Sequence, residues 1–148
     1  MKQHTMKNIF KQGPITPDFI ANSIAKHRDK KNIGAHSIFL GQVRNDIIEH
    51  KEVIAIEYTT YEAMANETFH ILRENLFHKY SLTCMHVYHS LGRVAAGEIS
   101  LFVFASSVHR TQAIEACHEI VELIKKDIPI WGLEIFEDES GVWKKPII

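Results

Sequence analysis

Apolar positions recur along this chain with two different spacings, and the spacing changes from segment to segment. Steps of three and four residues predict helices with one buried face, whereas apolar runs bounded by polar or glycine-containing stretches predict strands. The predicted helices run from Thr16 to about Arg28, from Glu62 to Lys79, and from near Ala113 to Pro129. The predicted strands are Gly34–Gly41, Val53–Tyr61, Thr83–His89 and Glu98–Ala105.

Helix boundaries carry their own signals. Thr16 is a good N-cap, Pro17 suits the first turn, and Asp18 complements the helix dipole there. The last predicted helix ends before Pro129, which cannot continue it. Its expected buried stripe consists of Ile114, Cys117, Val121 and Ile124.

The connections indicate how the strands are joined. Gly34–Gly41 and Val53–Tyr61, with the polar loop Arg44–Lys51 between them, are candidates for neighbouring strands, and Leu91–Gly97 is a candidate packed loop. Ile130–Glu137 and Val142–Lys144 flank a turn-rich stretch and predict a terminal hairpin. Because strands and helices alternate without a certain crossover order, the expected fold class is α+β.

Composition narrows the class of protein. The chain has 148 residues, 45% hydrophobic residues and a formal charge of −1, which fits a single domain over residues 1–148. A pI near 6.8 gives no basic field to attract nucleic acid, and no apolar run reaches the roughly 20 residues needed to cross a membrane. The N-terminus lacks the apolar core of a signal peptide, and Cys84 and Cys117 suit buried thiols in a reducing compartment. The expected location is the cytoplasm.

An anion site is predicted where an apolar run meets the last helix, in the segment Ser106–Thr111. The first N–H groups of a helix lack intrahelical partners and lie at the positive end of the dipole. Arg110 adds a fork of donors, and His109 adds a donor that titrates near neutral pH. The alternative is structural: Arg110 in a surface ion pair and His109 capping the loop.

Two further basic positions lie at predicted element ends. Arg44 follows Gly41 at the end of a strand, and Lys125 and Lys126 lie in the last turn of the last helix. Lys125 comes one turn after Val121, so its stem can lie along the core edge with its amine in a cleft. The structural alternatives are a solvated loop arginine and lysines that complement the helix dipole.

The histidines do not predict a metal site. His86 and His89 are the pair closest to ligand spacing, but they fall on a predicted strand, where a separation of three sends side chains to opposite faces. We therefore expect structural histidines, no metal ligands and no cofactor.

Five segments in order resemble the large subunit of molybdopterin synthase, and the resemblance runs from about Gly34 to Trp143. They are Phe39–Asn45, Tyr58–Met64, His89–Gly92, Ser106–Arg110 and Ile124–Trp131. The resemblance implies an α+β fold with a mixed, largely antiparallel sheet, helices packed on it and a small C-terminal hairpin. It also implies a homodimer within a heterotetramer, completed by a small ubiquitin-like sulfur-carrier subunit at each end.

The family's reaction implies roles for the basic residues. Sulfur from the carrier's C-terminal thiocarboxylate passes to cyclic pyranopterin monophosphate and forms the dithiolene of molybdopterin. By resemblance, Lys125 and Arg44 are catalytic, and His109 and Arg110 bind the pterin phosphate. Lys126 is assigned to substrate binding beside Lys125. Cations suit this chemistry because both reactants are anionic.

The chain departs from the family at one place. Where relatives commonly carry one or two lysines after the proline-aromatic-tryptophan stretch, this chain has Gly132 and Leu133, and Lys144 or Lys145 is the candidate substitute. Two alternatives to an active enzyme therefore stay open. One is a weakened relative that still binds pterin phosphate, and the other is a non-enzymatic module that binds the tail of a ubiquitin-like protein.

Overall fold

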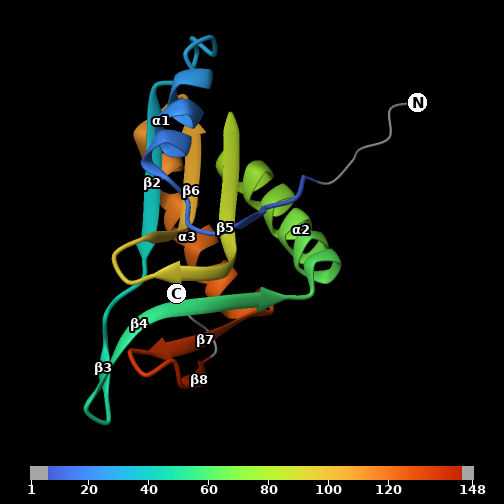
Figure 1. The fold of residues 1–148 in the computed structure, drawn as a ribbon. Coiled ribbons are helices and arrows are strands. Elements are labelled where there is room, and N and C mark those ends of the chain that lie inside the picture. Colours follow the sequence, from blue (N-terminus) through green and yellow to red (C-terminus); the bar gives the residue numbers. More distant parts are fainter. Residues whose placement is uncertain (1–6, 145–148) are drawn as a thin grey trace.

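A computed structural model describes residues 7–144, which build an eight-stranded sheet with helices on both faces (Figure 1). The helices are α1 (Pro17–Lys26), α2 (Glu62–Tyr80) and α3 (Arg110–Asp127). The strands are β1 (Phe10–Gln12), β2 (Ala35–Gln42), β3 (Ile47–Ile48), β4 (Lys51–Thr60), β5 (Cys84–Ala95), β6 (Ile99–Ser107), β7 (Ile130–Phe136) and β8 (Gly141–Lys144).

The sheet has the order β2-β6-β5-β4-β7-β8, with β1 added beside β5 and β3 beside β4. Every pairing is antiparallel except that of β1 with β5. The α+β class, the mixed and largely antiparallel sheet, and the C-terminal hairpin of β7 and β8 are therefore confirmed. Thr16 also caps α1 as expected, since its Oγ1 accepts a bond of 3.2 Å from the Phe19 N–H.

Two expected connections are wrong. β2 does not pair with β4; its partner is β6, while β4 lies between β5 and β7. The segment Leu91–Gly97 is not a packed loop, because β5 continues through it to Ala95 and its far end pairs with β4. Proximity in the sequence suggested that β2 pairs with β4, whereas pairing depends on which partner strand covers the apolar faces.

The long strand β5 changes partners along its length. Cys84–His89 pairs with β6, and Gly92–Ala95 pairs with β4. Gly92 lies at the change with φ +78°, a left-handed conformation that glycine adopts without steric cost. The change of partner joins the sheet's two parts, which lie at different angles in Figure 1.

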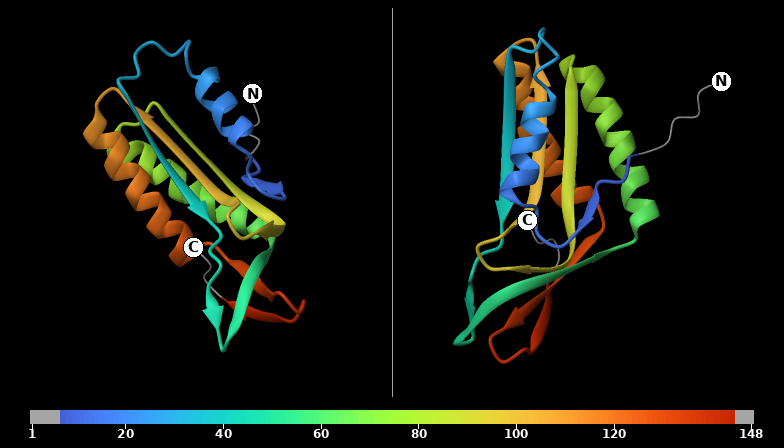
Figure 2. Two further views of the ribbon diagram at one scale, coloured as in Figure 1. Left: turned by 60° about the vertical axis from the view of Figure 1, so that its left-hand side comes forward. Right: turned by 45° about the horizontal axis from the view of Figure 1, so that its top comes forward.

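The two faces of the sheet are covered by different helices. α2 and α3 lie together on one face, and α1 lies on the other (Figure 2). Under α1, the apolar cluster consists of Ile15, Ile20, Phe102 and Phe104. The larger core lies beneath α2 and α3. Within residues 7–144, no helix has the length and apolar character needed to span a membrane.

The buried stripe of α3 differs from its prediction by one residue. Cys117, Val121 and Ile124 are buried as expected, but the Ile114 side chain is 56% exposed. The helix begins at Arg110 and turns the neighbouring Ala113 into the core instead. Ala113 and Ala116 are both fully buried here, where α3 packs against β2 and β6. Both cysteines are free and buried, as predicted.

His89 makes stability depend on pH. It is fully buried, its Nδ1–H donates to the Ser90 carbonyl at 2.8 Å, and burial lowers its pKa to about 4. The unfolded chain takes up a proton on His89 below about pH 6.5, whereas the folded chain does not until about pH 4, so stability falls as pH drops through this window. We expect about 2 kcal/mol of loss from His89 between pH 7.5 and pH 5. Urea unfolding at both pH values measures it, and a His89→Leu variant that keeps the full dependence would contradict this origin.

Candidate active site

A cavity of about 300 Å³ lies where the end of β2 meets β4, β7 and the last turn of α3. This volume is at the lower end of the range for small-molecule sites. Its charged lining residues are Arg44, Asp46, Lys125 and Glu134, and its other polar lining includes Gln42, Tyr58 and Ser100. Two of the residues selected from the sequence, Arg44 and Lys125, thus line one cavity although they are far apart in the chain.

The end of β2 places Arg44 at this cavity. The register of β2 against β6 shifts between Gly41 and Gln42, and such an irregularity redirects a strand. Val43 is then buried and held by two backbone bonds, its N–H to the Glu98 carbonyl at 3.0 Å and its carbonyl to the Gly97 N–H at 2.8 Å. The next residue, Arg44, therefore projects from an anchored backbone.

Arg44 is free to exchange partners. Its Nη2 lies 3.4 Å from Asp46 Oδ2, and its side chain is 77% exposed. Such exposed pairs contribute about 0–1 kcal/mol, so exchanging Asp46 for another anion costs little. The guanidinium carries a planar fork of donors that suits a carboxylate or a phosphate.

The last turn of α3 supplies Lys125. Ile124 beside it is buried, and Ile128 ends the helix with its N–H bonded to the Ile124 carbonyl at 3.2 Å. Lys125 lines the cavity. Lys126 is exposed and does not line it, because successive helical residues point about 100° apart. The substrate-binding role of Lys126 stays a prediction.

The cavity also contains two groups that were not selected from the sequence. Glu134 is 3% exposed and lies in β7 between apolar neighbours; a lone carboxylate in an apolar strand is the signal that would have found it. Tyr58 donates to Ser100 Oγ at 3.1 Å, and its pKa is raised, mainly by burial. The phenol therefore stays protonated at neutral pH and acts as a donor.

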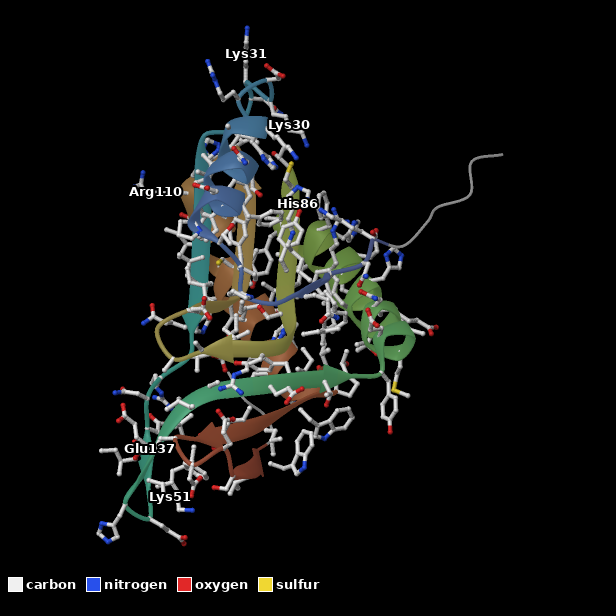
Figure 3. The ribbon with its side chains drawn as sticks, viewed as in Figure 1. Lys30, Lys31, Lys51, His86, Arg110 and Glu137 are labelled. Atoms are coloured by element: carbon white, nitrogen blue, oxygen red, sulfur yellow. The ribbon has the colours of Figure 1, made fainter. Side chains whose placement is uncertain are left out.

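His109 and Arg110 lie at the other end of α3. Arg110 begins the helix and Lys125 lies in its last turn, so their backbones are about 22 Å apart at 1.5 Å per residue. Figure 3 places Arg110 at the end of the sheet near Lys31 and far from Lys51 and Glu137. Within one copy of the chain, the predicted phosphate-binding pair and the cavity form two separate surfaces.

The start of α3 nevertheless has the geometry of an anion site. His109 is the N-cap residue but, within residues 7–144, makes no side-chain capping bond. The first N–H groups of the helix thus remain for an external acceptor. Gly34 allows two backbone segments to pass close together at this junction, because a Cβ on Gly34 would lie 2.0 Å from the Val108 carbonyl oxygen.

The structure also shows where Gly132 and Leu133 lie, the two positions at which lysine was expected from the family resemblance. Gly132 pairs with Tyr58 and lies on the face of β7 that carries Glu134, whereas Leu133 lies on the opposite face. Across the hairpin, the backbone of Lys144 pairs with that of Gly132. Lys145, the other candidate substitute, lies outside the described residues.

The fold and the site define a class: an α+β protein with a cavity at the end of α3 that contains Arg44 and Lys125 beside Asp46 and Glu134, and with an open helix N-terminus at the start of α3. The family model described as "MoaE protein" matches residues 11–127. The chain belongs to the MoaE protein family.

Relatives agree with this assignment. The molybdopterin synthase catalytic subunit of Oryza sativa subsp. indica is 39% identical over 112 residues, covering 76% of this chain and 57% of the rice protein. Molybdopterin synthase from Staphylococcus aureus matches with a TM-score of 0.79 at 26% identity, covering 95% of this chain and 98% of that one.

A structure of a complex of subunits 1 and 2 of molybdopterin-converting factor from Helicobacter pylori matches with a TM-score of 0.75 at 23% identity, covering 93% and 89% of the two chains. This likeness supports the fold. The present chain spans less than three fifths of the length of the first curated relatives that it matches.

Proposed function

We propose that this protein is the catalytic subunit of a molybdopterin synthase. In each transfer a carbon–oxygen bond of cyclic pyranopterin monophosphate is replaced by a carbon–sulfur bond, and the acyl–sulfur bond of a partner's C-terminal thiocarboxylate is broken by water. The oxygen leaves the substrate as water, and the partner is left with a carboxylate. A dithiolene contains two sulfurs, so two thiocarboxylates are consumed for each product. The observation that carries the proposal is the cavity in which Arg44 and Lys125 meet.

Arg44 and Lys125 give this cavity two cations for two anionic reactants, and Asp46 and Glu134 are the acids beside them. A phosphate ester and a thiocarboxylate are both anions, and bringing them together requires fixed positive charge. Arg44 binds one anionic group after leaving Asp46. Lys125 stabilises the negative charge that develops on the acyl oxygen as sulfur is transferred.

We further propose that a second copy of the chain completes the site. The 22 Å between the two ends of α3 exceeds the span of one small ligand, so His109 and Arg110 cannot reach a phosphate held by Lys125 of the same copy. In a symmetric dimer, the start of α3 from one copy can face the cavity of the other. Each dimer then holds two equivalent sites.

The proposed partner is a small ubiquitin-like sulfur carrier whose C-terminal tail enters the cavity, in a heterotetramer around the dimer. The Helicobacter pylori complex of two subunits, built on the same fold, supports a two-component enzyme. We place the enzyme in the cytoplasm, because two buried free thiols suit a reducing compartment.

The first test of the function compares adjacent lysines. We expect Lys125→Ala to slow single-turnover sulfur transfer by about a hundredfold or more, as for the loss of one preorganised group that stabilises an oxyanion. Lys126→Ala, its matched control, should slow the reaction far less, because Lys126 does not line the cavity. Transfer is followed by mass spectrometry of the carrier and by product formation. Equal effects of the two variants would contradict the role assigned to Lys125.

Mixed dimers test the shared site. Arg110→Ala and Lys125→Ala should each be nearly inactive alone, but a dimer of one copy of each contains one intact site and one doubly altered site. Random pairing of the two variants should restore about a quarter of wild-type activity. Absence of recovery, with mixed dimers verified by dual affinity tags, would place both residues in one copy's site and overturn the shared arrangement.

The missing lysine yields a third test. We propose that Lys144, paired with Gly132, supplies the charge that relatives carry at that position. Lys144→Ala should then slow transfer at least about tenfold, because a cation that stabilises developing negative charge is lost. Adding Gly132→Lys to Lys144→Ala should restore the rate, whereas adding Leu133→Lys on the opposite face should not. A Lys144→Ala variant with wild-type rate would instead favour a site that works without this lysine.

A further inference from the structure

Three potential metal ligands meet on the α1 face of the sheet, away from the cavity of Arg44 and Lys125. They are His27 at the C-terminal end of α1 and Cys84 and His86 at the start of β5. One ligand atom from each lies within 4.8 Å of the others. Figure 3 shows His86 near Lys30 at the end of the sheet opposite Lys51 and Glu137.

The local fold explains why these residues converge. Cys84 and His86 are two residues apart on one strand, so they share a face, and His89 lies on the other. The sequence analysis considered His86 together with His89, which lies on the opposite face of the strand. The true neighbour, His27, arrives from α1, and its ring centroid lies 5.0 Å from that of His86.

His27 is oriented as a ligand. Its Nδ1–H donates to the Ser23 carbonyl at 2.7 Å, which fixes the tautomer with a lone pair on Nε2. Metal-binding histidines commonly donate their second ring nitrogen in this way. Nε2 is buried and has no hydrogen-bond partner among residues 7–144, and the whole residue is 9% exposed. A buried acceptor without a partner is costly, and a bound cation would satisfy it.

Cys84 already has a cationic partner. The Lys30 ammonium donates to Cys84 Sγ at 2.8 Å, so the sulfur accepts from a positively charged group at the place where an ion would bind. Lys7, from the other side, lies 3.3 Å from His86 Nδ1. Both lysines are exposed, so their ammonium groups can withdraw into water when a stronger cation binds.

We propose that His27, Cys84 and His86 form a binding site for a divalent metal ion of the zinc class. Two imidazoles and a thiolate are typical ligands of zinc, and three protein ligands leave a fourth position open. For three ligand atoms that lie within 4.8 Å of one another, a point exists that is at most about 2.8 Å from each of them. Each ligand atom therefore has to move toward this point by under about 1 Å to reach zinc bond lengths.

A small cavity of about 200 Å³ adjoins the two histidines of the cluster. Its other polar lining residues are Lys7, Ser23, Lys26 and Tyr88. It has room for a water molecule as the fourth ligand. Because His27 ends α1 and the other ligands begin β5, the bound ion would clamp that helix onto the sheet.

Metal binding can be measured directly on the whole protein after removal of any histidine tag, under reducing conditions. Cobalt(II) is the optical probe for zinc sites. We expect a thiolate-to-cobalt charge-transfer band in wild type that zinc abolishes by displacement, and a zinc-dependent rise in Tm. Cobalt spectra without the thiolate band would overturn the proposal.

Variants locate the site. Cys84→Ser should abolish the thiolate band, and His86→Gln should weaken zinc binding at least about tenfold, the loss that even outer-shell changes reach. Cys117→Ser and His78→Gln, which alter the other thiol and an exposed histidine, are the controls and should bind as wild type does. Circular dichroism of the metal-free variants checks that each is folded. Unchanged zinc affinity in His86→Gln, or equal losses in the controls, would overturn the site.

Replacing Lys30 tests the proposal by an expected gain, rather than a loss, of zinc affinity. Lys30→Met removes the competing ammonium, and we expect severalfold tighter zinc binding. Weaker binding would overturn the exchange of ammonium for metal.

Discussion

The strand β5 is the constraint on which the rest of the structure depends. It pairs with β1 and β6 along its first part and with β4 along its last residues, so one continuous backbone joins two differently oriented parts of the sheet. This change of partner at Gly92 brings β4 and β7 beneath the end of β2. The cavity forms at that junction, and without the extension of β5 its walls would belong to separate sheets.

The length of α3 governs the proposed chemistry. The helix carries an open N-terminus at one end and Lys125 at the other, and its rigidity keeps the two anion-binding regions about 22 Å apart. A protein that must gather two anionic reactants can use both regions together only by combining two copies. The proposed facing of the two ends agrees with their exposure in one copy: His109 and Arg110 are exposed, and Arg44 forms a weak surface pair with Asp46.

Much of the secondary structure could be predicted, because each signal is local. Thr16 caps α1 and Pro17 is its first residue. Pro129 follows the end of α3, and the turn after Phe136 connects the two strands of the hairpin. Part of the candidate cavity could be found from the sequence: Arg44 and Lys125 both line it, Lys126 does not, and Glu134 was not selected. Ile114 was placed in the core because an apolar side chain fits a helical stripe, but the neighbouring Ala113 occupies that position. Which of two adjacent residues faces inward depends on how the helix docks.

The sequence by itself determined the elements, the basic positions at their ends and the resemblance to a family, because these depend on residues close together in the chain. Only the tertiary structure decided which distant residues meet. It paired β2 with β6, separated Arg110 from Lys125, set Lys144 opposite Gly132 and brought His27 to Cys84 and His86. These outcomes follow from strand register and helix docking, in which the burial of whole apolar faces outweighs the preference of any single residue.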